Sequence, residues 1–304
     1  MNTSINIAGL TWKNPVTTAS GTFASGQEYA DFVDLNALGA VTTKGVSSVP
    51  WTGNPTPRIC ETPAGMMNAI GLQNPGVDVF IARDLPYLAQ FDTNVVVNVC
   101  GHSIEEYVDV VEKLSDQSGV HMLEINVSCP NVKEGGMAFG TDPEMLAKVT
   151  REVKAKAKQP ISIKLSPNVT DIALMAKAAE DAGADAISMI NTFQAMRIDV
   201  VNRRFVLANK TGGLSGPAIH PIAVRMVYDV HKAVKIPIIA MGGIADGYDA
   251  IEFLLAGATA VAVGVSNFRY PKVTRQVIRE MTDYMETFGV TDINELIGGV
   301  IDDE

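Results

Sequence analysis

Cysteine is scarce in this chain, whose 304 residues include only Cys60, Cys100 and Cys129. An odd number of thiols in a long chain gives no sign of a disulfide framework and fits a reducing compartment. Three thiols are also fewer than the four that hold a ferredoxin-type iron–sulfur cluster. We therefore expect a cytoplasmic protein that carries no cluster of its own.

Long apolar runs and a basic leader are also missing. No stretch of about 18 apolar residues occurs, so no membrane span is expected, and no secretory signal opens the sequence. The net charge of −10, from 24 basic and 34 acidic residues, argues against binding to nucleic acid. Because 47% of the residues are hydrophobic and 19% charged, a folded domain with a sizeable core is expected.

The sequence does contain a repeated alternation of short Val- and Ile-rich runs with longer helical segments. Several of the runs are apolar on both faces, which is typical of strands in a buried parallel sheet. Eight runs in about 300 residues predict an α/β fold, a (β/α)8 TIM barrel forming one domain over 1–304. An open doubly wound sheet shares the pattern, but no GxGxxG motif follows the first run. The runs are 16–20, 40–45, 94–100, 122–129, 161–166, 186–192, 236–243 and 260–265.

Five helices between these runs have the clearest signals. Ser103 and Glu106 have the spacing of a capping box, Pro143 suits a first helical position, and Gly183 can end a helix. The predicted helices are 103–117, 143–157, 170–181, 218–233 and 246–256.

Two connections, 46–75 and 193–217, are too long for plain loops. The first contains five prolines, and the second alternates enough to predict a small extra hairpin. Both follow strands at the carboxyl end, which is the active-site face of a barrel. We expect them to be long active-site loops.

Polar residues gather where the predicted strands end. A single one is most simply the cap of the next helix, but two lysines and three asparagines together favour a site. A buried lysine needs an anionic partner, and an asparagine offers a donor and an acceptor to a planar heterocycle. These residues are Ser20, Lys44, Asn98, Asn126, Ser128, Cys129, Lys164, Asn191 and Thr192.

Glycines follow the last two runs, where barrels commonly bind phosphate. Gly242 and Gly243 would let backbone amides approach a phosphate, as would Gly264, although tight strand–helix packing is an alternative for each. A flavin mononucleotide, FMN, could use this anchor. Cys129 lies among polar loop residues, which favours a functional thiol. The four histidines are scattered, so no metal site is predicted.

Ten segments resemble the dihydroorotate dehydrogenases, and more narrowly the catalytic subunits of their NAD-linked class 1B in bacterial pyrimidine synthesis. The resemblance runs nearly the full length and implies a barrel that holds FMN at its C-terminal face. The segments are ASGTF (19–23), TTKGV (42–46), GNPTPR (53–58), MNAIGLQNPG (67–76), INVSCPNVKEGG (125–136), IKLSPN (163–168), INTF (190–193), NKTGGLSGPAIHPIAVRMV (209–227), MGGI (241–244) and AVGVSNF (262–268).

The resemblance also implies roles for single residues, with Cys129 as the catalytic base. FMN would contact Ser20, Lys44, Gly45, Asn98, Asn126, Lys164, Ile190, Gly216, Gly242, Gly243, Gly264 and Val265. Dihydroorotate would contact Lys44, Asn68, Ala69, Ile70, Gly71, Leu72, Asn126, Asn131, Asn191 and Thr192.

Two positions depart from the family pattern. Val265 stands where the family usually has Thr, so a backbone contact to phosphate survives and a hydroxyl contact does not. Cys100 replaces a residue that is usually Ala, and nothing in the sequence explains this change.

The implied reaction oxidises dihydroorotate to orotate. Cys129 would take a proton from C5, for which its unperturbed pKa of about 8.5 is suitable, while the flavin takes a hydride from C6. Lys164 would stabilise the negative charge of the reduced flavin, and the asparagines would orient the substrate.

Reoxidation by NAD would need a partner, because this chain has neither a dinucleotide motif nor enough cluster cysteines. The resemblance implies an electron-transfer subunit carrying FAD and a [2Fe–2S] cluster, in a heterotetramer built on a homodimer of this chain.

Alternatives remain open at this point. A fumarate-reducing class 1A enzyme works alone, and a related barrel reduces pyrimidines. The membrane-bound class 2 enzymes are disfavoured, because they use serine as the base and carry an N-terminal membrane helix. Two hypotheses from other classes of function also remain. One is a phosphate-binding barrel without redox function, and the other is a scaffold whose polar strand ends serve only as helix caps.

Overall fold

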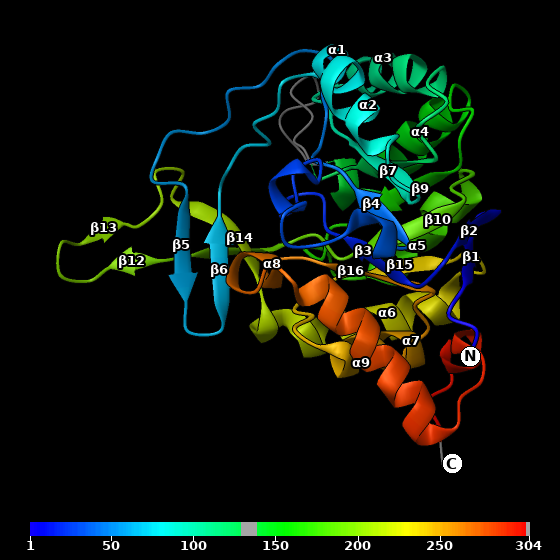
Figure 1. Ribbon diagram of the computed structural model, residues 1–304. Coiled ribbons are helices and arrows are strands. Elements are labelled where there is room, and N and C mark those ends of the chain that lie inside the picture. Colours follow the sequence, from blue (N-terminus) through cyan, green and yellow to red (C-terminus); the bar gives the residue numbers. More distant parts are fainter. Residues whose placement is uncertain (129–138, 302–304) are drawn as a thin grey trace.

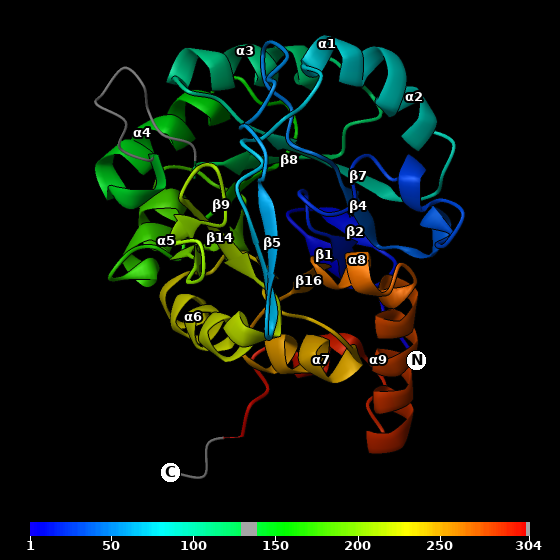
Figure 2. The same ribbon diagram turned by 90° about the vertical axis from the view of Figure 1, so that its left-hand side faces the viewer.

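The computed structural model describes residues 1–128 and 139–301. Its centre is an eight-stranded parallel sheet rolled into a barrel and surrounded by helices (Figures 1 and 2). The predicted TIM barrel and its eight strands are confirmed. In sheet order these strands are β3 (Val16–Thr18), β16 (Ala260–Val263), β15 (Ile238–Ala240), β10 (Ala186–Met189), β9 (Ile161–Lys164), β8 (Met122–Asn126), β7 (Asn94–Val99) and β4 (Ala40–Thr42).

The barrel closes between β3 and β4 through threonine side chains and a backbone hydrogen bond, from the N–H of Gly39 just before β4 to the Val16 carbonyl at 3.1 Å. The Thr18 hydroxyl donates to the Thr42 carbonyl and accepts from the Thr42 backbone N–H, both at 3.1 Å. The Thr17 and Thr42 hydroxyls lie 3.0 Å apart beside them. One threonine side chain therefore satisfies two buried backbone groups that a neighbouring strand would otherwise pair.

The five predicted helices are present, and their ends either coincide with the predicted ends or lie at most three residues inside them. Asp142 and Asp171 accept the backbone N–H groups at the starts of their helices. The Ser103–Glu106 pair differs from a standard capping box, because Glu106 accepts from the N–H of His102, one residue before the cap. These helices are α3 (Ile104–Ser115), α4 (Pro143–Lys154), α5 (Ile172–Asp181), α6 (His220–Ala233) and α7 (Gly247–Leu255).

Further helices were not predicted. The long α9 (Val273–Phe288) buries a face with Val273, Val277, Met281 and Met285 at a spacing of four residues. It packs against α7 and β3 (Figure 1). The short ones are α1 (Val77–Val79), a π-helical turn (Phe80–Asp84), α2 (Leu85–Leu88) and α8 (Ser266–Arg269). In the described part of the chain, no helix is both long and apolar enough to cross a membrane.

The two long connections join in one small antiparallel sheet over the carboxyl end of the barrel (Figure 2). Its order is β11 (Phe193–Met196), β14 (Thr211–Ser215), β6 (Gly65–Asn68) and β5 (Ile59–Thr62). The predicted hairpin is therefore only part of the arrangement. Its tip is a second pair, β12 (Ile198–Asp199) and β13 (Arg204–Phe205), which projects from the molecule (Figure 1).

An unpredicted N-terminal hairpin, β1 (Ile5–Ile7) and β2 (Leu10–Trp12), lies at the amino end of the barrel (Figure 1). Trp12 is fully buried there, as is Ile7. Each large apolar side chain buried in this way contributes about 1.5–3 kcal/mol to stability. The hairpin therefore covers one end of the barrel and leaves the other end for the polar residues.

Candidate active site at the carboxyl end of the barrel

Four polar side chains meet inside the barrel near the carboxyl ends of its strands. Lys164 Nζ donates to Ser20 Oγ at 3.3 Å and lies 3.7 Å from Glu124 Oε1. The same Glu124 oxygen accepts from Asn98 Nδ2 at 2.7 Å. All four residues are at most 7% exposed, so strands far apart in the sequence bring a buried charged cluster together.

Glu124 was not predicted as a site residue. It lies in β8 between Leu123 and Ile125, and the strand register places it beside Asn98 of β7. The sequence did carry a signal, because a lone carboxylate within an apolar strand is costly unless it is paired. The structure supplies the partners, which lie on the two neighbouring strands.

The Asn98 amide has one free acceptor. Its Oδ1 is buried and, in the described part of the chain, has no hydrogen-bond partner. A Cβ at Gly45 would lie 2.7 Å from this oxygen, so glycine at 45 leaves room for the amide. A buried acceptor without a partner indicates a place for a ligand donor.

Lys44 is close to this cluster. Burial lowers the pKa of its ammonium group below the ordinary value. Cys100 opposes that lowering, whereas the positive charges of Lys164 and Arg58 add to it. Lys44 therefore lies in a cationic region that an anion would stabilise.

A second polar group connects β8 with the end of β10. Asn191 Nδ2 donates to Asn126 Oδ1 at 3.1 Å and to Ser128 Oγ at 2.9 Å. Asn191 Oδ1 accepts the backbone N–H of Thr192 at 2.8 Å. Asn126 is next to Lys164 in the strand register, so this amide network adjoins the charged cluster.

The predicted substrate loop, residues 68–72, lies at the end of β6 in the small sheet. Asn68 pairs with Gly213 of β14, and a Cβ at Gly213 would lie 2.0 Å from Thr192 Oγ1. This close approach places Thr192 next to β14. Since β14 pairs with β6, where the loop begins, Thr192 lies near the start of the loop. Gly71 and Leu72 both have positive φ, which makes the loop turn sharply.

The glycines after the last strands are not equivalent. A Cβ at Gly243 would lie 2.7 Å from the Gly216 carbonyl, and one at Gly242 would lie 2.7 Å from Ala223 Cβ. Packing alone therefore requires these two glycines. At Gly264 a Cβ would approach only Ala19, at 3.6 Å, so this position is open on the side where a ligand could approach.

Backbone donors also collect near these turns. Within residues 1–128 and 139–301, the N–H groups of Gly243, Gly264 and Val265 donate to no protein acceptor. Backbone N–H groups of this kind bind phosphate well. Val265 thus offers a backbone donor although it lacks the usual hydroxyl.

Two other predicted cofactor positions are buried among backbone. Gly216 has a φ of +111°, and its Cβ would lie 2.5 Å from Gly65 Cα. Ile190 is 3% exposed and donates its N–H to the Met241 carbonyl at 3.1 Å. Both lie beside the Gly242–Gly243 turn, and their proposed contacts with a cofactor remain predictions.

Cys129 and Asn131 lie outside the described residues, so their predicted roles stay predictions. Asn126 and Ser128, directly before Cys129 in the sequence, belong to the amide network described above. Cys100 is fully buried and its thiol donates to the Val46 carbonyl at 3.4 Å. Cys60 lies in β5 of the small sheet.

His220 supports the Gly242 turn from α6. One ring nitrogen is 2.9 Å from the Gly242 carbonyl, and the other is 3.0 Å from Glu252 Oε2 and 3.6 Å from Asp249 Oδ1. The scattered positions of the histidines in the sequence did not indicate this cluster. Its contacts hold α6, α7 and the turn together.

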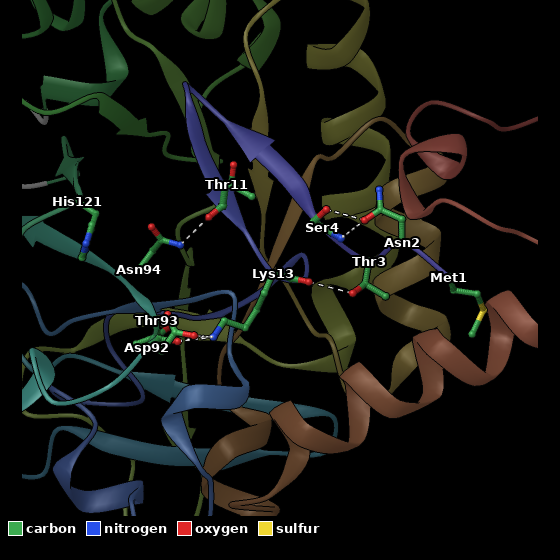
Figure 3. A pocket seen from close by; sticks show the side chains of 10 residues that line it. All are labelled: Met1, Asn2, Thr3, Ser4, Thr11, Lys13, Asp92, Thr93, Asn94 and His121. Atoms are coloured by element: carbon green, nitrogen blue, oxygen red, sulfur yellow. Dashed lines mark hydrogen bonds and ion pairs between the residues drawn. The ribbon is translucent and has the colours of Figure 1, made fainter.

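A polar pocket of about 590 Å³ lies at the opposite end of the barrel, under the N-terminal hairpin (Figure 3). Its polar side chains form ion pairs and hydrogen bonds with each other and with the backbone. Lys13 Nζ pairs with Asp92 at 2.7 Å, and Asn94 Nδ2 donates to the Thr11 carbonyl at 3.1 Å. These contacts anchor the hairpin, so we place the site at the carboxyl end.

Comparisons with known proteins identify the family of this chain. The family model for dihydroorotate dehydrogenase matches residues 2–285. The chain is 64% identical over 300 residues to the "Dihydroorotate dehydrogenase B (NAD(+)), catalytic subunit" of Lachnoclostridium phytofermentans, covering 99% of this chain and 100% of the relative. It is 57% identical to the protein of the same description from Alkaliphilus oremlandii, covering 98% of each.

A solved structure of DHODH in complex with ferulenol, from Eimeria tenella, has the same fold. It superposes with a TM-score of 0.81 at 24% sequence identity, over 97% of this chain and 88% of the other. The matched length of the family model and the high identity of the relatives decide the assignment. The chain belongs to the dihydroorotate dehydrogenase family.

Proposed function

We propose that this chain is the catalytic subunit of an NAD-linked dihydroorotate dehydrogenase, which uses FMN to oxidise dihydroorotate to orotate in pyrimidine biosynthesis. The observation that carries this proposal is the buried cluster of Lys164, Glu124 and Asn98 beside the Asn126–Asn191 amide pair. It lies where barrel enzymes keep their active sites. The relatives with this description match nearly the whole chain.

The residues present fit a flavin nucleotide. The free Asn98 Oδ1 can accept a hydrogen bond from a ring N–H, and the open Gly264 with the free N–H groups around it suits a phosphate. FMN would be held by Ser20, Lys44, Gly45, Asn98, Asn126, Lys164, Ile190, Gly216, Gly242, Gly243, Gly264 and Val265.

Bound FMN would supply a hydride acceptor. The chain's own residues would bind the substrate and remove its proton. Asn126 and Asn191 fix the substrate ring, because their hydrogen-bonded amides are already oriented. Lys44 binds the substrate carboxylate, and the Cys129 thiolate takes the proton from C5. Lys164 would hold the flavin ring and would offset negative charge on it.

Substrate contacts extend to the small sheet. Dihydroorotate would touch Lys44, Asn68, Ala69, Ile70, Gly71, Leu72, Asn126, Asn131, Asn191 and Thr192. The small sheet lies over the carboxyl end of the barrel, so the loop from β6 would exclude water from the bound ring.

Electrons would leave through a partner. The relatives' description as a catalytic subunit supports a second subunit, which we propose carries FAD and a [2Fe–2S] cluster. We further propose a homodimer of this chain within a heterotetramer in the cytoplasm, each copy being one domain over 1–304.

Flavin content and acceptor choice test this function. The purified chain should be yellow, hold one FMN, and oxidise dihydroorotate with a redox dye but not with NAD until the partner is added. A colourless chain that takes up no added FMN would overturn the proposal. Turnover by the chain alone with fumarate would assign it to class 1A instead.

A further inference from the structure

Glu124 is a buried carboxylate for which the reaction described above has no role. It is 1% exposed and enters the barrel from the middle of β8. Its Oε1 is 2.7 Å from Asn98 Nδ2 and 3.7 Å from Lys164 Nζ. Since an uncompensated buried charge is strongly destabilising, these two contacts account for its presence in the barrel.

The first contact decides which way the Asn98 amide points. An ionised carboxylate only accepts hydrogen bonds, so the amide nitrogen must face Glu124. The amide oxygen then points away from Glu124 and is the buried atom without a partner. Without the carboxylate, the amide could turn over and present a donor in place of an acceptor.

The second contact sets the charge of the site. Lys44 and Lys164 bring two ammonium groups close enough to influence each other. Glu124 places one negative charge against Lys164 in a region that excludes water. At short distance and low dielectric, such a charge changes the energy of any other charge formed nearby.

We propose that Glu124 is a positioning residue that fixes Asn98 as an acceptor for the flavin ring and lowers the flavin reduction potential by offsetting Lys164. This inference rests on the proposed function, since it requires FMN at the carboxyl end. Glu124 does not touch the reacting atoms, and it acts through its two neighbours.

The effect of the Glu124 charge on the flavin potential is tested with E124Q, which removes the charge and keeps the size of the side chain. The midpoint potential of bound FMN is measured by anaerobic reduction in equilibrium with a reference dye, without substrate. We expect the equilibrium to shift at least tenfold toward reduced flavin, which is a rise of about 30 mV for two electrons. A potential equal to that of the wild type would overturn the charge role.

D185N is the matched control. Asp185 is a partly buried carboxylate paired with Lys154 at 2.6 Å, and it directly precedes β10 at the amino end of the barrel. Its neutralisation removes the same charge far from the site. We expect no change in the flavin potential, and an equal shift in D185N and E124Q would remove the specific role of Glu124.

The orientation of the Asn98 amide is tested with E124D. Its side chain is one methylene shorter, so the charge is kept but lies farther from Asn98. Quenching of flavin fluorescence by the apoprotein should show FMN binding at least fivefold weaker than in the wild type. Unchanged binding would overturn the orientation role, and this variant decides the matter if E124Q does not fold. A wild-type chain that binds no FMN would instead refute the proposed function.

Discussion

Lys44 shows how one residue can link the site to pH. Burial lowers the pKa of its ammonium group, and the nearby charges of Lys164 and Arg58 add to this effect. An anion beside Lys44 favours the protonated form and raises that pKa again. Anion binding and proton uptake at Lys44 are therefore coupled.

This coupling predicts the pH dependence of orotate binding to the FMN-loaded chain. Because the anion prefers protonated Lys44, affinity should fall as pH rises through the pKa of the free site. K44M should bind orotate about 10- to 100-fold more weakly, the loss of one charge-assisted hydrogen bond. The same fall with pH in K44M, measured by calorimetry, would assign the dependence to another group.

The proposed base gives a second prediction at this scale. Cys129→Ser should slow flavin reduction by dihydroorotate about 100-fold or more at neutral pH, because a serine hydroxyl is a far weaker proton acceptor. FMN content should be unchanged. Anaerobic rapid mixing measures the rate, and a full rate in the variant would remove the role of Cys129.

Several residues of the candidate site could be chosen from the sequence, because their type and their place at strand ends carried the signal. Ser20, Lys164 and Asn98 do meet, as do Asn126 and Asn191. Glu124 was missed because its meaning depends on side chains from neighbouring strands. For Gly242 and Gly243 the sequence left packing as an alternative to phosphate binding, because the contacting atoms of Ala223 and Gly216 come from a different segment of the chain.

At the scale of elements, the Thr18 hydroxyl makes two of the hydrogen bonds that cross the seam between β3 and β4. T18V should leave the buried N–H and carbonyl of Thr42 without partners. An unsatisfied buried group costs about 1–3 kcal/mol, so the free energy of unfolding should fall by at least about 2 kcal/mol. Urea unfolding of the apoprotein measures this loss.

T18S is the control for the seam, because it keeps the hydroxyl and removes only a methyl group. Its loss should be about 1 kcal/mol, in line with a buried methylene. Equal stability of T18V and the wild type would mean that other contacts close the barrel.

Periodicity revealed the strands and five helices, because each of these elements shows its pattern locally. The pairing of 46–75 with 193–217 was not predicted, because β6 and β14 are far apart in the sequence and no local pattern indicates that they pair. The N-terminal hairpin was missed because its two strands have only three residues each. For α9, by contrast, the four-residue spacing of Val273, Val277, Met281 and Met285 was present in the sequence.

At the scale of the whole molecule, bound FMN should stabilise the folded barrel, because its proposed contacts come from strands on opposite sides of the barrel. A ligand that binds only the folded state at 100 times its Kd stabilises it by about 2.7 kcal/mol. For a chain of 304 residues this raises Tm by about 4 °C. Calorimetry with and without FMN measures the shift, and a Tm independent of FMN would contradict the proposed binding.

The most direct test is anaerobic addition of one equivalent of dihydroorotate to the flavin-loaded chain without a partner. The account predicts that the visible flavin absorbance is lost and orotate forms in equal amount, while dihydrouracil leaves the absorbance unchanged. An absorbance that dihydroorotate does not alter, in protein that dithionite fully bleaches, would contradict it.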